Sequence, residues 1–128
     1  MSPDEFKART RKYAIRVIRL VDALPASRST NALANQLVRS GTSVGANYRA
    51  ACRAKSRADF ISKMGTVEEE TDEPLYWMEL LVESGKIKPE RVASLMKEGS
   101  EILAMVCASA KTARFSNQSA IRNPQSAI

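Results

Sequence analysis

The stretch SGTSVGANYRAACRAKS, residues 40–56, carries the feature that decides the fold. Two glycines four residues apart, Gly41 and Gly45, stand among small side chains, and three cations follow them. A glycine inside a helix costs roughly 1 kcal/mol relative to alanine, so a helix that keeps two must recover that free energy through packing. Gly41 lies on the same apolar stripe as Leu37 and Val44. We therefore interpret both glycines as positions where a neighbouring helix packs closely.

A phosphate-binding glycine loop is the other role that such glycines can have. That loop needs a preceding strand and either a Gly-Lys-Ser or a Gly-x-Gly-x-x-Gly spacing. The sequence around residues 40–56 has neither spacing and no strand pattern before it. The glycines therefore indicate helix packing.

Amphipathic helical patterns continue on both sides of this stretch. Apolar side chains recur every three or four residues in four segments: 6–24, 33–52, 60–82 and 92–110. Ser2 and Ser56 stand where the first and third helices should begin, and each has an acid three residues later, as in a capping box. Thr30 or Asn31 is expected to cap the second helix.

Short connections between amphipathic helices make consecutive helices antiparallel neighbours. The sequence thus predicts an all-α fold, an antiparallel up-and-down four-helix bundle, as one domain over residues 1–115. Residues 116–128 carry no helical pattern, and we expect them to form a disordered C-terminal tail.

The composition excludes several classes of protein. The chain of 128 residues contains no histidine, which removes Ser-His-Asp and Cys-His catalysis and the histidine-containing di-iron sites of helix bundles. No run approaches the roughly 18 apolar residues of a membrane span, and no apolar stretch follows the charged N-terminus as in a signal peptide. We therefore expect a non-enzymatic cytoplasmic protein with reduced cysteines, no cofactor and no membrane partner.

Opposite charges are segregated along the chain, although the net charge is +6. Residues 23–58 contain six cations and no acid, whereas residues 59–83 contain eight acids and one cation. A basic segment of this kind is typical of proteins that bind nucleic acid or an anionic surface. The two segments can equally pair with each other, and both interpretations stay open.

For the second helix, pairing with the third is the favoured interpretation. We expect Arg53 to be buried beside a carboxylate of the acidic segment, within a structural polar network of five residues: Ser43, Asn47, Arg53, Glu68 and Asp72. The acidic run at residues 68–73 could also hold a magnesium ion. No second cluster of ligands converges on it, so we expect no metal site.

The first helix carries the clearest candidate for nucleic-acid binding. Arg9, Lys12, Arg16 and Arg19 recur at three, four and three residues, which places four cations along one edge of the helix. Such a stripe would bind phosphates without sequence preference and in a salt-dependent way. A solvated face, or pairing with acids, is the alternative. No aromatic residues interleave with the arginines, so stacking on bases is not supported.

Four bulky residues are candidates for a subunit interface. Ile15 and Ile18 point away from the core stripe of the first helix, and exposed branched aliphatic side chains favour an interface. Tyr76 and Trp77 are adjacent and cannot both face one core, so one of them is a second interface candidate.

Several blocks in and between the second and third helical segments form a recognisable pattern: Gln36 to Ser40, Ser43 to Asn47, Arg53, Ser56, Asp59-Phe60 and Gly65 to Glu69. Together they resemble the four-helix bundle family named for the 23S rRNA intervening-sequence protein. Arg53 and Asn47 match positions marked in the family pattern. The sequence departs from that pattern at Ala50-Ala51, where the family commonly has Glu-Gly.

The resemblance implies an antiparallel bundle that assembles as a ring, usually a homopentamer, with no established enzymatic activity. Relatives are encoded within insertions in ribosomal RNA genes, and the chain is also similar to the accessory proteins of diversity-generating retroelements. These associations suggest RNA or DNA as a partner. The sequence therefore predicts an oligomeric scaffold that binds nucleic acid through basic stripes. The alternative is a protein-binding adaptor whose charged faces serve only subunit assembly.

Overall fold

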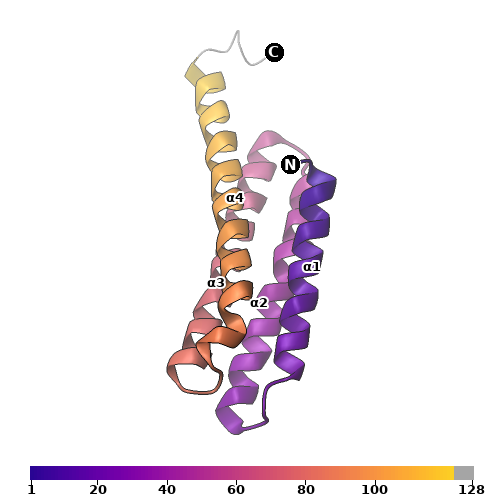
Figure 1. Ribbon diagram of the computed structural model, residues 1–128. Helices are drawn as coiled ribbons and strands as arrows, with labels where there is room; N and C mark the ends of the chain where they lie inside the picture. Colours follow the sequence, from indigo (N-terminus) through magenta and orange to yellow (C-terminus); the bar gives the residue numbers. More distant parts are fainter. Residues whose placement is uncertain (123–128) are drawn as a thin grey trace.

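The computed structural model describes the backbone of residues 1–122 and the side chains of residues 1–116. This part of the chain forms four helices and no strand: α1 (Pro3–Asp22), α2 (Arg28–Cys52), α3 (Arg57–Glu83) and α4 (Pro89–Arg122). The helices run alternately up and down, joined by short connections (Figure 1). The predicted antiparallel four-helix bundle is confirmed.

Serine hydroxyls cap the first three helices. Ser2 accepts a hydrogen bond from the backbone N–H of Glu5 at 3.1 Å, and Ser56 accepts one from the N–H of Asp59 at 3.0 Å, as the sequence predicts. The cap of α2 is Ser27, whose hydroxyl accepts from the N–H of Thr30 at 3.1 Å. The expectation that Thr30 or Asn31 caps α2 is therefore wrong, because a serine three residues earlier already satisfies that donor.

The fourth helix is longer than the sequence pattern predicts. It continues to Arg122 and projects past the rest of the bundle (Figure 1), so a tail beginning at residue 116 is wrong for residues 116–122. No glycine or proline interrupts the sequence between Gly99 and Pro124, and nothing local ends the helix earlier. The remainder of the expected tail, residues 123–128, lies outside the described residues.

The core is a single cluster to which every helix contributes a stripe of apolar side chains. Its largest fully buried members are Tyr13 and Val17 from α1, Leu37 and Val44 from α2, Met64, Val67, Met78 and Leu81 from α3, and Val92, Ile102 and Val106 from α4. The closest neighbours are the consecutive helices, and the contact of α1 with α4 is the smallest of the four. Side-chain bonds between these two helices therefore matter more than elsewhere in the bundle.

The glycines of α2 lie where α1 approaches most closely. A Cβ atom at Gly41 would stand 2.9 Å from Cγ1 of Val17, and one at Gly45 would stand 3.0 Å from the hydroxyl oxygen of Thr10. Both distances are shorter than an ordinary van der Waals contact, so a larger residue would push α1 away. The interpretation of the glycines as packing positions is confirmed.

Tyr13 carries a buried hydroxyl that has no hydrogen-bond partner among the described residues. Its ring is fully buried, and burial raises the pKa of the phenol, so it stays neutral at every ordinary pH. Gly99 of α4 makes room for it, since a Cβ there would lie 2.8 Å from the hydroxyl oxygen. The ring thus contributes packing, while the hydroxyl adds a desolvation cost.

Replacement of Tyr13 by phenylalanine is expected to stabilise the bundle by about 1 kcal/mol, because an unpaired buried hydroxyl costs roughly 1–3 kcal/mol. Urea denaturation of both proteins measures the difference. Tyr76→Phe is the matched control, since that hydroxyl belongs to an exposed side chain. A clear loss of stability in Tyr13→Phe would show that a water molecule satisfies the hydroxyl.

Candidate functional site

Arg9, the first member of the predicted basic stripe, is engaged by α4. Its guanidinium donates to both carboxylate oxygens of Glu98, at 2.9 Å from Nε and 2.7 Å from Nη2, and Nη2 lies 3.3 Å from Glu101. The side chains of Arg9 and Glu98 are only 25% and 21% exposed. The hydrogen bond from Arg9 lowers the pKa of Glu98, and the same bond raises the pKa of Arg9. This pair ties α1 to α4.

Of the other three members of the stripe, one contacts α4 and two do not. Arg16 donates to the hydroxyl of Ser94 at 3.0 Å and so also faces α4. Lys12 and Arg19 are exposed, and no described carboxylate lies within ion-pair distance of either. The expectation of four exposed cations along one edge is therefore wrong for Arg9 and Arg16, which are partly buried against α4. The stripe runs along the side of α1 next to α4, so Arg9 and Arg16 reach that helix, whereas Lys12 and Arg19 point to solvent.

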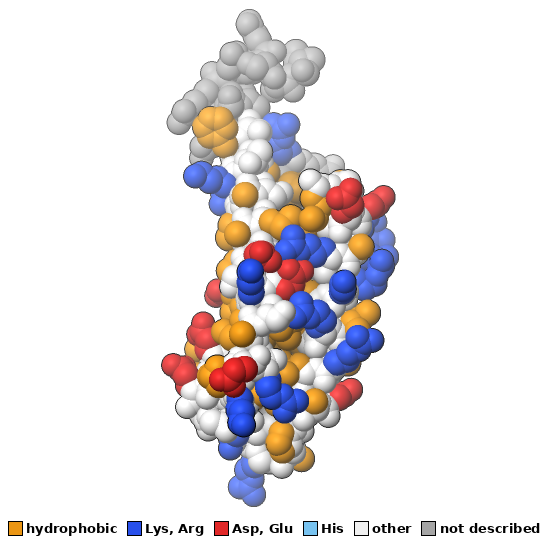
Figure 2. Space-filling model, viewed as in Figure 1, with side chains coloured by type: hydrophobic (Ala, Val, Ile, Leu, Met, Phe, Trp, Pro, Cys, Tyr) orange, Lys and Arg blue, Asp and Glu red, His pale blue; other side chains and the backbone are white. Residues whose placement is uncertain are grey.

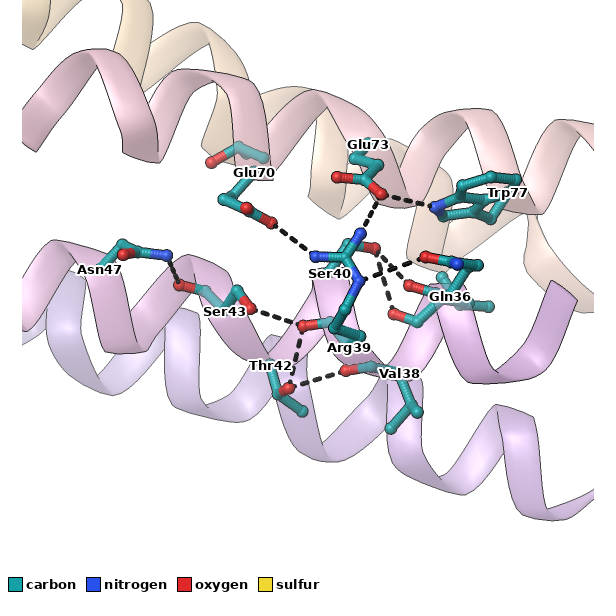
Figure 3. A network of polar contacts seen from close by, with 12 residues as sticks. Gln36, Val38, Arg39, Ser40, Thr42, Ser43, Asn47, Glu70, Glu73 and Trp77 are labelled. Carbon is teal, nitrogen blue, oxygen red and sulfur yellow. Dashed lines mark hydrogen bonds and ion pairs between the residues drawn. The ribbon is translucent and has the colours of Figure 1, made fainter. Parts of the chain in front are cut away.

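Figure 3 shows the polar network that joins α2 to α3, with Arg39 at its centre. The guanidinium of Arg39 pairs with Glu73 and lies 3.5 Å from Glu70, and its Nε donates to Gln36 at 3.2 Å. The indole N–H of Trp77 donates to the same Glu73 oxygen at 3.2 Å. Pairing of the basic second helix with the acidic third helix is thus present.

The residues predicted for this network are different from those observed. Arg53 is exposed, because α2 ends at Cys52 and Arg53 is its C-cap, so burial of Arg53 beside a carboxylate is wrong. Ser43 and Asn47 bond within their own helix, Ser43 to the carbonyl of Arg39 at 2.6 Å and Asn47 to that of Ser43 at 2.9 Å. They support the backbone of α2 and do not cross to α3.

The predicted acids also lie elsewhere. Glu68 faces α4, with its carboxylate 4.0 Å from the guanidinium of Arg114. Asp72 is exposed. The helical period places Glu70 and Glu73 on the side of α3 that faces α2, whereas Glu68 and Asp72 lie toward α4. The five expected members therefore do not form one network.

The predicted interface residues are exposed, with one exception. Ile15, Ile18 and Tyr76 keep 42%, 40% and 51% of their surface accessible. Trp77 is half-buried against the core, and its ring meets that of Tyr76 edge to face at 5.1 Å. Tyr76 is thus the member of this pair that faces outward, as the sequence requires for one of the two.

A groove between α1 and α2 brings together cations that sequence reasoning did not connect. Lys7 and Arg11 of α1 and Arg49 of α2 line it, around a floor that includes Gly45 and Ala46. Its volume is about 190 Å³. Gly45 is the sequence feature from which this groove could be predicted. A glycine packed against Thr10 fixes the antiparallel register of α1 and α2, and that register places Arg49 opposite Lys7 and Arg11.

The described residues hold no group of three or more Asp, Glu or Cys side chains that could bind a metal ion. Among the helices of residues 1–122, none is long and apolar enough to cross a membrane. The candidate site is therefore a surface, made of exposed cations on α1 and α2 and of exposed apolar side chains on α1 and α3.

Comparison with known proteins identifies the family. A family model described as 23S rRNA-intervening sequence protein matches residues 5–108. The crystal structure of a protein of unknown function from the S23 ribosomal protein family of Bacteroides thetaiotaomicron is similar, with a TM-score of 0.79 and 34% sequence identity over 87% of this chain and 99% of that one. No curated protein matches the chain. Since the family model covers most of the chain, the chain belongs to the 23S rRNA-intervening sequence protein family.

Proposed function

We propose that this protein is a non-enzymatic, oligomeric scaffold that binds nucleic acid through its phosphate backbone. One observation carries the proposal: cations on the outer sides of α1 and α2 are exposed and have no carboxylate partner among the described side chains. They include Arg11, Lys12, Arg19 and Arg49. Figure 2 shows Lys and Arg side chains gathered along the middle of α1, on the right of the view.

Other cations of the protein are paired with carboxylates, which distinguishes them from these exposed ones. Arg9, Arg39, Lys63 and Arg114 each lie within reach of a carboxylate, so the fold neutralises part of its positive charge internally. The cations left over include Arg11, Lys12, Arg19 and Arg49 on the outer sides of α1 and α2. Unneutralised cations on one surface attract the regularly spaced charges of a nucleic-acid backbone.

Substitution of Lys12 and Arg19 by glutamine is expected to weaken RNA binding without unfolding the bundle, because neither side chain makes an ion pair in the described structure. Each phosphate contact contributes about 0.7–0.9 to the slope of log K against log salt, so the slope should fall by about 1.5. Fluorescence anisotropy with a mixed-sequence RNA at several salt concentrations measures it.

The charge-matched control is Lys88→Gln with Lys111→Gln, two exposed cations away from the outer sides of α1 and α2. It should bind as the unmodified protein does. Absence of RNA binding by the unmodified protein would contradict the proposed function. In that case the adaptor alternative, in which charged faces serve only assembly, becomes the preferred one.

Self-assembly into a ring, with five subunits as the expected number, is the second part of the proposal. Exposed Tyr76 on α3 supports it, because an apolar side chain at such exposure favours a subunit contact. Ile15 and Ile18 on α1 are also exposed, but the helical period places them next to Arg11, Lys12 and Arg19, so a contact there would cover those cations. The same residues would support a protein-binding adaptor.

We place the protein in the cytoplasm, since both cysteines are free thiols, as in a reducing compartment.

Light scattering behind a sizing column is expected to give a mass several times the 14.1 kDa of one chain, and about five times that value for the ring. Glutamate at Tyr76 should shift the protein toward the single-chain mass, because it places charge in an apolar contact. Glutamate at exposed Phe115 is the control. A single-chain mass for the unmodified protein at micromolar concentration would contradict assembly.

A further inference from the structure

The groove between α1 and α2 differs from the rest of the basic surface in its shape. Its floor includes Gly45 and Ala46, and no large apolar side chain lines it. The two helices come close here because Gly45 lacks a Cβ that would otherwise meet Thr10 at 3.0 Å. The groove is therefore a narrow recess built by packing, open to solvent and about 190 Å³ in volume.

Three cations share this recess with no acid among the residues that line it. Lys7 and Arg11 are one helical turn apart on α1, and Arg49 faces them from α2. None of the three makes an ion pair with a described carboxylate, although Arg9 and Arg39 on the same two helices do. Like charges around one recess repel one another, so an anion bound there would gain from all three at once.

The two hydroxyls that line the groove are already committed to the backbone. Thr10 donates to the carbonyl of Lys7 at 3.0 Å, and Thr42 donates to that of Val38 at 2.7 Å. The remaining donors are the ammonium group and the two guanidinium groups. Such a donor set fits a phosphate, whose several oxygens accept from guanidinium in a fork geometry and from lysine as a point charge.

We propose that this groove is a phosphate-binding site, and that it holds one backbone phosphate of the bound nucleic acid. The assignment of the phosphate to nucleic acid rests on the proposed function. Lys12 and Arg19, which lie outside the groove, add attraction without a fixed position. Gly45 and Arg49, one helical turn apart on α2, are thus parts of one site, since Gly45 sets the width of the recess that Arg49 borders.

One test compares two double variants that remove the same charge. Arg11→Gln with Arg49→Gln removes two groove cations, whereas Lys88→Gln with Lys111→Gln removes two exposed cations elsewhere. Near 0.1 M salt a lost phosphate contact weakens binding roughly five- to eightfold, so the groove variant, which loses its one phosphate contact, should bind mixed-sequence RNA roughly five- to eightfold more weakly. The second variant should bind as the unmodified protein does. Equal binding by all three proteins would overturn the groove site and leave nucleic-acid binding in place.

A second pair of variants changes the groove without removing its cations. Ala46 is exposed, so Ala46→Glu and Ala46→Gln should both fold. The glutamate places a carboxylate among the three cations and competes with phosphate, whereas the glutamine has nearly the same size and no charge. Ala46→Glu should bind RNA at least about fivefold more weakly than Ala46→Gln. Equal affinity of the two variants would overturn the proposal.

Titration with inorganic pyrophosphate tests the phosphate site independently of nucleic-acid binding. In the ¹⁵N-labelled unmodified protein it should shift the amide signals of residues 45, 46 and 49, and these shifts should vanish in the Arg11→Gln and Arg49→Gln variant. Such shifts without any RNA binding would support the phosphate site and overturn the nucleic-acid function. Absence of the shifts would overturn the site, whatever the RNA measurement gives.

Discussion

Leucine at position 41 is expected to destabilise the bundle by about 1–3 kcal/mol, the cost of forcing extra methylenes into a packed core. Gly41 is buried, and even a Cβ there would stand 2.9 Å from Cγ1 of Val17. Val17 is fully buried and β-branched, so its side chain has no other rotamer to retreat into without disturbing α1. The added volume must therefore separate α1 from α2.

Chemical denaturation followed by circular dichroism measures this loss. Leucine at Gly65 is the matched control, because a Cβ at that position of α3 meets no atom within 4 Å. Alanine at Gly41 should be milder, since its gain in helix propensity of roughly 1 kcal/mol offsets part of the contact with Val17. If leucine at 41 left the denaturation midpoint unchanged, α1 would not pack on α2 as described.

We expect the second large loss of stability from removal of the Arg9–Glu98 pair. Either Arg9→Ala or Glu98→Ala should cost about 1.5–3 kcal/mol, the range for hydrogen bonds to charged groups, with the lower end favoured because both side chains keep some exposure to solvent. The pair joins α1 to α4, the least extensive of the four helix contacts. A double-mutant cycle with both alanines isolates the coupling.

The same pair makes stability depend on pH in a defined direction. The pKa of Glu98 is lowered in the folded state by the hydrogen bond from Arg9, so folding favours the carboxylate. Its stabilising contribution is complete above the unfolded pKa, near 4.5, and is lost as the pH falls through the lower folded value. Glu98→Gln should lack this part of the acid sensitivity, whereas Glu90→Gln, at an exposed position, should keep it. Identical acid profiles for Glu98→Gln and the unmodified protein would contradict this role.

Local signals in the sequence were sufficient for the fold. The apolar period, the serine caps before the first and third helices, and the glycines of the second helix are all properties of near neighbours in the chain, and each predicted the structure correctly. The two errors in the predicted helix ends also concern local signals. Ser27 caps α2 ahead of the expected position, and α4 runs on to Arg122 because the sequence places no helix breaker before that point.

The candidate surfaces could be predicted only in part. The exposed apolar residues Ile15, Ile18 and Tyr76 were identified correctly, because the helical period determines which side chains point away from a core. The helical period does not show which neighbouring helix lies beside a given side of a helix. Arg9 and Arg19 therefore looked equivalent, although one is bound to Glu98 and the other is open to solvent.

The sequence by itself determined a four-helix bundle, its core stripes and the close packing of the second helix on a neighbour, because each depends on spacing within one helix. Only the tertiary structure decided which charges are neutralised: Arg39 rather than Arg53 meets the acids of α3, and Lys7, Arg11 and Arg49 share a groove without acids. Such pairings depend on the register and rotation of two helices. Long charged side chains tolerate many registers at similar cost, so the register is fixed by the packing of core residues and the charges follow it.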